Sequence, residues 1–313
     1  MRIVVIDHIY LENTHIQQLR AIGETQIFPE PPKSDNEIEK RIQGAEIVVT
    51  GWSHLTKAII DSSPRLKMIS IWATTCHYVD LEAARQRGII VTHVPAYSTE
   101  AVAEHTFGLL LASVRKLLQA DRHVREGGFD WRPFVVMELA GKTLGLVGTG
   151  AIGLRVGEMG KAFKMRILGF DKIHNPRRAQ EIGLEYVDLQ TLLKESDIVS
   201  LHLTLTPTTE GFIGQEEIAQ MKRGAVLINT SQGKIINENA LVKALKSKKL
   251  SYAGLDVFAE EPPEHHNPLM ELDNTVLSPH VGFTTAEAVK RCTDICIDNV
   301  KHFVEGHPQN LCQ

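Results

Sequence analysis

Short β-branched hydrophobic runs alternate along this chain with segments of helical periodicity, in two successive series. The first series predicts strands at 2–7, 26–28, 47–50, 67–71 and 89–92, with helices at 14–20, 35–43, 56–61 and 80–87. The second predicts strands at 143–147, 166–171, 185–187, 197–203, 225–229, 252–257 and 275–277, with helices at 152–163, 189–195, 215–221 and 238–246. Such alternation favours parallel sheets with helices on both faces. The fold class expected is therefore α/β, with two Rossmann-like, doubly wound domains.

Two longer amphipathic stretches, 99–125 and 285–303, belong to neither series. We interpret them as helices that cross between the domains, the second returning the C-terminus to the first domain. One domain then comprises residues 1–97 and 284–313, and the other residues 98–283. A length of 313 residues is in keeping with two domains. Because clefts between domains are preferred ligand sites, we expect a ligand cleft at the crossings.

A glycine-rich turn follows the first strand of the second series. Gly148 would allow the tight turn, Gly150 the approach of a pyrophosphate, and Gly153 the packing of helix against strand. Asp171 ends the next strand, 18 residues past Gly153, near the spacing typical of a ribose-binding acid. Its negative charge opposes a 2′-phosphate and favours NAD over NADP. The loop residues expected to bind the cofactor are Gly148, Thr149, Gly150, Ala151, Ile152 and Gly153.

Hydride transfer to or from a C–OH carbon also needs a group that takes or gives the hydroxyl proton, and histidine suits both roles. The chain has 14 histidines, and His280 stands out because it follows the last strand of the second series. Glu261 follows the preceding strand, at the same carboxyl edge where open α/β sheets bind ligands. From the spacing alone, the two residues form either a proton-transfer pair or an ordinary surface salt bridge.

Composition excludes several classes of function. The net charge of −4 and the absence of a Lys/Arg run argue against nucleic-acid binding. No apolar stretch approaches the roughly 18–20 residues of a membrane helix, and the N-terminal strand turns polar too soon for a signal peptide. The expected location is cytoplasmic. The four cysteines fit a reducing compartment, with Cys292 and Cys296 as structural thiols and no metal site.

Several motifs, in order, resemble the D-2-hydroxyacid dehydrogenase family. They include AVAEH at 101–105, GLVGTGAIG at 145–153, GLDVF at 254–258 and SPHVG at 278–282, and the resemblance covers most of the chain. It implies an NAD-dependent oxidoreductase acting on a small 2-hydroxy or 2-keto acid. Residues 1–97 with 284–313 would be a flavodoxin-like substrate domain, and 98–283 the NAD-binding domain.

The resemblance also assigns roles to residues. It implies His280 as the acid/base, Glu261 as its partner, and Asp256 and Thr230 at the cofactor. It implies a homodimer built around the 99–125 helix. Trp131 is the candidate to reach the neighbouring subunit's site, with ordinary packing as the alternative.

Two positions depart from the family pattern, both on the substrate side. The stretch Asn-Thr-x-Arg-Gly reads NTSQG at 229–233, so Gln232 occupies the place of the catalytic Arg. In the substrate loop Thr74, Thr75 and Cys76, Thr75 stands where glycine is usual. A neutral amide cannot replace the charged, planar fork of arginine toward a carboxylate.

These departures leave three hypotheses. The first is an oxidoreductase of this family with an altered, anionic substrate. The second is a non-catalytic NAD(H)-sensing protein on the same scaffold, and the third is an enzyme disabled at the Arg position. The polar groups of interest for an altered substrate are His54, Thr74, Thr75, His77 and Arg132.

Overall fold

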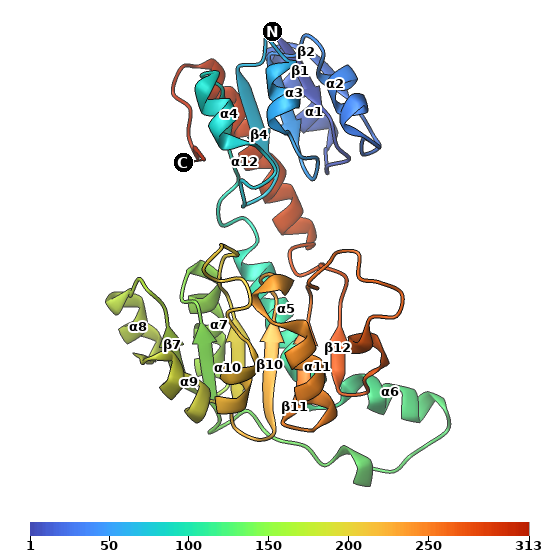
Figure 1. Ribbon diagram of the computed structural model, residues 1–313, viewed down its shortest axis with the longest axis vertical. Helices are drawn as coiled ribbons and strands as arrows, with labels where there is room; N and C mark the ends of the chain where they lie inside the picture. Colours follow the sequence, from blue (N-terminus) through green and yellow to red (C-terminus); the bar gives the residue numbers. More distant parts are fainter. Residues whose placement is uncertain (313) are drawn as a thin grey trace. The chain divides into compact units, whose positions relative to one another are not determined.

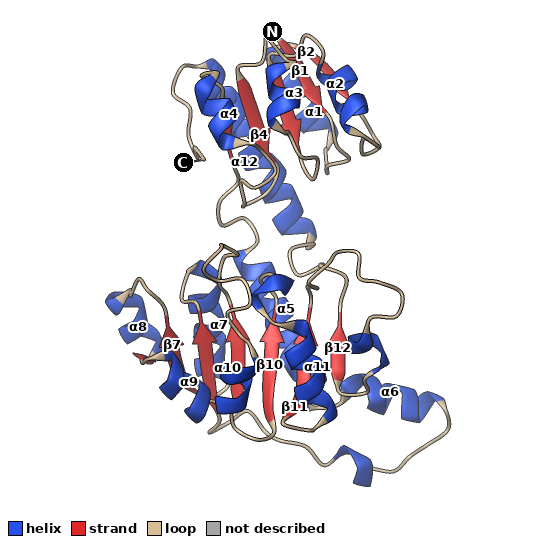
Figure 2. Ribbon diagram, in the orientation of Figure 1, coloured by secondary structure: helices blue, strands red, loops and turns tan. Residues whose placement is uncertain are grey.

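The computed structural model describes residues 1–312 and divides the chain into two compact units. Unit 1 comprises Met1–Ser98 with Thr284–Gln313, and unit 2 comprises Thr99–Phe283. Each unit is a parallel sheet between two layers of helices, which Figures 1 and 2 show. The expected fold class is confirmed. Within the described residues, no helix is both long and apolar enough to cross a membrane.

The sheet of unit 1 has five strands in the order β2-β1-β3-β4-β5, all pairs parallel. Its strands are β1 (Arg2–Val5), β2 (Glu24–Ile27), β3 (Ile47–Thr50), β4 (Met68–Ile71) and β5 (Ile90–Thr92). Its helices are α1 (Asn13–Ile22), α2 (Asp35–Ile42), α3 (Lys57–Asp61), α4 (Leu81–Gln86) and α12 (Ala286–Val304). This strand order is the flavodoxin-like one. Helices α1 and α12 form one layer, and α2, α3 and α4 form the other.

The sheet of unit 2 has seven parallel strands in the order β12-β11-β10-β9-β6-β7-β8. They are β6 (Thr143–Val147), β7 (Arg166–Phe170), β8 (Leu184–Tyr186), β9 (Ile198–Leu201), β10 (Ala225–Asn229), β11 (Leu250–Leu255) and β12 (Thr275–Leu277). The helices are α5 (Thr99–Val114), α6 (Leu117–Arg125), α7 (Ala151–Ala162), α8 (Pro176–Ile182), α9 (Leu189–Glu195), α10 (Gln215–Gln220) and α11 (Glu238–Lys246). Short 3-10 turns lie at Arg132–Phe134, Gly233–Ile235 and Pro268–Glu271.

The strand order of unit 2 reverses direction between β6 and β9, which makes this the topological switch point of the sheet. The strands are apolar on both faces because helices cover both, and β6, β9 and β10 are buried along their whole length. Separate hydrophobic clusters fill the two faces. Strands β6 and β9 remain paired to their carboxyl ends, but α7 after β6 and α10 after β9 lie on opposite faces of the sheet, which leaves a crevice for a ligand at this edge.

The stretch expected to form one helix at 99–125 forms two. Lys116 adopts a left-handed conformation, with φ 50° and ψ 39°, and separates α5 from α6. Helix α5 is largely buried against β10, β11 and α7, whereas α6 has no buried residue. The two stretches read as domain crossings are thus each packed within one unit, α5 in unit 2 and α12 in unit 1.

The expectation of four reduced cysteines is wrong for two of them. Cys76, in the loop after β4, and Cys312 form a disulfide within unit 1, with Cα atoms 6.2 Å apart. Backbone hydrogen bonds from Cys312 N to Val91 O and from His93 N to Asn310 O hold the tail beside β5. The sequence concealed this pairing because 236 residues separate the two cysteines. Cys292 and Cys296 are free, buried thiols on α12.

Candidate active site

The glycine-rich loop lies at the switch point of unit 2, between β6 and the N-terminus of α7. Gly148 has φ +99°, and a Cβ there would lie 2.6 Å from the carbonyl oxygen of His202. A Cβ on Gly153 would lie 2.1 Å from the carbonyl oxygen of Gly148, so helix and loop approach as closely as glycine allows. A Cβ on Gly150 would meet open space, which leaves its backbone accessible to a ligand. These features fit a pyrophosphate at the start of α7.

A cavity of about 890 Å³ adjoins this loop and is lined by residues that include Thr149, Gly150, Ala151 and Asp171. Asp171 accepts hydrogen bonds from Thr149 N, at 2.6 Å, and from Ile173 N, at 3.2 Å. Its carboxylate is thus fixed beside the loop, at the end of β7. The residues present fit the adenosine half of a dinucleotide, with Asp171 toward the ribose.

Two arginines on the wall of the same cavity are paired with acids. Arg178 lies 2.5 Å from Glu181 and 3.5 Å from Glu158, and Arg155 lies 2.8 Å from Glu100. These guanidinium groups face carboxylates already in place, so a 2′-phosphate would meet no unpaired arginine there.

The geometry brings together the His280 and Glu261 side chains. His280 Nδ1 lies 2.6 Å from Glu261 Oε2, while Phe258 N donates to Glu261 Oε1 at 3.1 Å. Since a carboxylate only accepts, Nδ1 carries the hydrogen and Nε2 is turned away from Glu261. The imidazole is 43% exposed, which leaves Nε2 accessible to a small molecule.

The electrostatics of this pair favour a protonated imidazole. The pKa of His280 is raised above its ordinary value, first by the hydrogen bond to Glu261, against the opposing effect of burial. Burial favours the neutral acid of Glu261, but hydrogen bonds from His280 and from the Phe258 N–H outweigh it and lower the pKa of that carboxyl. The pair can therefore hold a proton on the imidazole and release it from Nε2.

Asp256 lies at the end of β11 and organises the turn that carries His280. Its carboxylate accepts hydrogen bonds from Ser278 Oγ, at 2.5 Å, Val281 N, at 2.9 Å, and Gly282 N, at 2.8 Å. The neighbouring Thr230, after β10, shares a 2.8 Å hydrogen bond with Thr106 of α5.

Gln232 follows β10 in a loop at the same carboxyl edge of the sheet. Asn229 Nδ2 donates to Gln232 O at 2.9 Å, and a Cβ on Gly233 would lie 1.9 Å from Phe258 O. The backbone around Gln232 is thus held closely between the loops after β10 and β11. The side chain is partly exposed and neutral.

The substrate-loop candidates Thr74, Thr75 and Cys76 lie in unit 1, after β4. Thr74 Oγ1 donates to Val94 O at 3.1 Å, and His93 Nδ1 lies 2.7 Å from Thr74 O. Cys76 is joined to Cys312, so hydrogen bonds and a covalent bond restrain this loop. His54 and His77 lie near it, their ring centroids 6.0 Å apart.

Two histidines that sequence reasoning did not single out lie at the functional edge of unit 2. His202 follows β9 against the glycine loop, and burial lowers its pKa to about 3, so its ring is neutral. His105 on α5 contacts Ser278 and Asp256. The strand expected at 197–203 included His202, whereas β9 ends at Leu201. His105 ends the family motif at 101–105, and that motif was the signal that could have singled it out.

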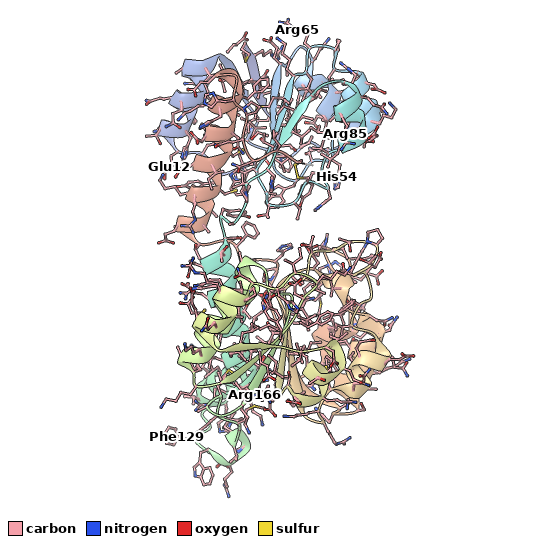
Figure 3. The ribbon with its side chains drawn as sticks, turned by 90° about the vertical axis from the view of Figure 1, so that its left-hand side faces the viewer. Glu12, His54, Arg65, Arg85, Phe129 and Arg166 are labelled. Atoms are coloured by element: carbon pink, nitrogen blue, oxygen red, sulfur yellow. A yellow bond between two sulfur atoms is a disulfide. The ribbon has the colours of Figure 1, made fainter. Side chains whose placement is uncertain are left out.

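Exposed apolar side chains gather on α6 and the segment after it. Phe129 is 98% and Trp131 75% exposed, and Leu117, Leu118 and Val124 are also exposed. Figure 3 shows Phe129 projecting from this segment.

Comparison with known proteins identifies the scaffold. A family model described as D-isomer specific 2-hydroxyacid dehydrogenase, NAD binding domain, matches residues 107–282. Glyoxylate reductase of Korarchaeum cryptofilum is 40% identical over 288 residues, which cover 90% of this chain and 87% of that protein.

Two solved structures extend the likeness to the whole chain. An acyclic imino acid reductase (Bsp5), in complex with NADPH and D-Arg, superposes with a TM-score of 0.93 at 34% identity, covering 100% of both chains. A D-lactate dehydrogenase from Aquifex aeolicus, complexed with NAD and lactic acid, gives a TM-score of 0.85 at 32% identity, covering 98% of this chain and 96% of that one.

Proposed function

The chain belongs to the D-isomer specific 2-hydroxyacid dehydrogenase family, NAD-dependent oxidoreductases that act on CH–OH groups, and from this premise we propose the reaction and the residues that perform it. The proposed reaction is hydride transfer between NAD and a small 2-hydroxy or 2-keto acid, or a related anion. The names of the relatives, which include glyoxylate reductase and D-lactate dehydrogenase, support this substrate class.

The observation that carries the proposal is the 2.6 Å contact between His280 Nδ1 and Glu261. When bound, NADH would supply the hydride that reduces the carbonyl carbon. His280 donates a proton from Nε2 to the carbonyl oxygen, and Glu261 stabilises the imidazolium beforehand and orients the ring. In the oxidising direction, neutral His280 takes the hydroxyl proton.

The substrate side is where we expect this chain to differ from its relatives. Gln232 offers one neutral amide to a substrate carboxylate, and Thr75 narrows the approach to backbone N–H groups of the loop Thr74–Cys76. We propose that both residues shift preference away from a plain 2-keto acid. The other interpretation of Gln232 is that it impairs an enzyme whose substrate is still an ordinary 2-keto acid.

Cofactor preference follows from Asp171. Its fixed carboxylate repels a 2′-phosphate, and the paired Arg155 and Arg178 do not offset that repulsion. NADH should bind more tightly than NADPH in a fluorescence titration, and Asp171→Ala should narrow the gap. Equal dissociation constants for wild-type protein would contradict the assignment.

A homodimer is proposed through α6 and the segment that follows. The exposed apolar side chains there, Trp131 and Phe129 foremost, suit an interface between copies. Trp131 of one subunit would reach the apolar pocket beside His280 of the other, a pocket of about 460 Å³. Sedimentation should give twice the chain mass, and Trp131→Asp with Phe129→Asp should give monomer.

The decisive experiment separates an enzyme from a sensor. NADH oxidation is followed with glyoxylate, pyruvate, hydroxypyruvate, keto phosphonates, aldehydes and a 2-imino acid, for wild type and His280→Ala. An enzyme turns over at least one compound, and His280→Ala slows it about 10²–10⁴-fold without weakening NADH binding. Tight NADH binding with no turnover of any compound would favour the sensor.

A further inference from the structure

A second histidine of unit 2 is linked to the turn that carries His280. His105 Nε2, on α5, lies 2.9 Å from Ser278 Oγ and 3.2 Å from Asp256 Oδ1. Ser278 has one hydroxyl hydrogen and gives it to Asp256 at 2.5 Å. The Ser278 oxygen must then accept a hydrogen bond from His105, so the Nε2–H of His105 points toward Ser278 and Asp256.

Asp256 makes three further hydrogen bonds to that turn, while its own backbone N–H donates to Asn229 O on β10. Val281 N and Gly282 N donate to its carboxylate, and His280 N donates to its backbone oxygen at 2.8 Å. These bonds coincide with φ +53° at His280, a left-handed conformation that a non-glycine residue rarely adopts. Asp256 therefore restrains the backbone on both sides of the His280 Cα, through the N–H of His280 and the N–H of Val281.

Close packing fixes His105 against the same turn. A Cβ on Gly282 would lie 2.9 Å from Asp256 Oδ2 and 3.3 Å from Cδ2 of His105. The imidazole of His105 thus closes off the carboxylate from the helix side. Asp256 is 2% exposed and His105 26% exposed, so the contact is largely shielded from water.

The buried carboxylate depends on its donors to stay charged. Burial alone would raise the pKa of Asp256, but the hydrogen bond from His105 and then those from Ser278 and the backbone lower it. The charge of Asp256 in turn adds to the raised pKa of His280.

We propose that His105 is a positioning residue that, through Ser278 and Asp256, holds the His280 turn in the geometry that faces Glu261. The proposal deepens the function above and rests on His280 being its acid/base. Among the described residues, the hydrogen bonds and ion pairs of His105 are to Ser278 and Asp256, and on this view it does not contact the substrate. Loss of its donor frees the Ser278 and Asp256 side chains to rotate, and small displacements of an acid/base can cost up to about 10²-fold in rate.

The test compares His105→Gln, whose amide keeps a donor at similar reach, with His105→Leu, which removes it. A matched control is His302→Asn, which changes a helical histidine that is 29% exposed and lies beside Asp298 in unit 1. The readouts are kcat, KM, the NADH dissociation constant and, by NMR titration of the cofactor-free protein, the pKa of His280.

His105→Leu should lower kcat about 10-fold or more and lower the pKa of His280, while NADH binding changes less than about twofold. His105→Gln should recover kcat to within about threefold of wild type. Wild-type kcat and an unmoved His280 pKa in His105→Leu would overturn the proposal. So would a failure of His105→Gln to restore a lost kcat, since the role would then be structural.

A second variant and a readout that is independent of turnover distinguish a folding failure from a loss of function. Should His105→Leu not fold, His105→Ala, which also removes the donor, takes its place. Failure of both to fold would overturn the proposal in favour of a structural role. If wild type reduces no compound, the proposed function fails, yet the NMR titration still tests whether His105 sets the His280 turn.

Discussion

The neutral amide of Gln232 sits in a site that otherwise has the means to bind a dinucleotide and move a proton. It lies at the carboxyl end of β10, in the loop packed against Phe258. Each hydrogen bond to a charged group contributes about 1.5–3 kcal/mol, so an arginine fork would strengthen the hold on a carboxylate considerably. On the function proposed above, this single residue would bear directly on which anion is bound.

Gln232→Arg should raise kcat/KM on glyoxylate, pyruvate or hydroxypyruvate by about 10²-fold or more. The partly exposed loop can accommodate the longer side chain. The control is Gln232→Met, which has similar length and no donor. An Arg variant that folds, binds NADH and stays inert on all three acids would rule out a merely disabled keto-acid reductase.

The pH dependence of the reaction follows from the raised pKa of His280. With His280 as the proposed acid, carbonyl reduction needs the protonated imidazole, so kcat/KM should be highest below this pKa and fall as pH rises through it. Glu261→Gln removes the carboxylate that raises the pKa, and the descending limb should move to lower pH. The neighbouring Glu260→Gln serves as the control. If the descending limb of the kcat/KM profile lies at the same pH in Glu261→Gln as in wild type, another group donates the proton.

At the scale of elements, we propose that the β6–α7 unit binds the cofactor through its backbone. The helix begins directly after the glycine loop and packs very closely against it. A Cβ on Gly153 would lie only 2.1 Å from the carbonyl oxygen of Gly148, so only glycine fits there. The free N–H groups at the start of α7 would hold the phosphates of a bound dinucleotide.

Gly153→Ala should weaken NADH binding about 10-fold or more, because the methyl group would push α7 away from the loop. Gly108→Ala is the matched control: this exposed glycine of α5 has open space around it, and alanine should stabilise the helix by about 1 kcal/mol. Fluorescence titration with thermal unfolding measures both. Unaltered NADH binding in a folded Gly153→Ala variant would contradict this account of the loop.

At the scale of the molecule, the two units have separate cores and unit 1 alone contains the disulfide. The bond joins the loop after β4 to the C-terminal tail across 236 residues of sequence. A cross-link of that span restricts the unfolded chain and stabilises the folded one, typically by about 2–4 kcal/mol.

Reduction of the Cys76–Cys312 disulfide should therefore lower the unfolding temperature of unit 1 and leave the unfolding temperature of unit 2 unchanged. Cys312→Ser should match reduced wild type, and adding reductant to this variant should change nothing further. Calorimetry with and without reductant makes the comparison. Four titratable thiols in the denatured, non-reduced protein would show that the bond does not form.

Local signals in the sequence determined the α/β class, the two series of strands and the cofactor loop. Glycines at set intervals after a buried strand have few structural alternatives, and the periodicity of two against 3.6 residues separates strand from helix. His280 and Glu261 were selected by a simple rule, since both follow strands of one parallel sheet.

Only the tertiary structure decided how remote residues meet. It divided the 99–125 stretch at Lys116, joined Cys76 to Cys312, and brought His105 to Ser278 across 173 residues. Periodicity reports which face of an element is buried but not what that face packs against. Those partners depend on strand order and helix packing, which bring distant segments together only once the sheet has formed.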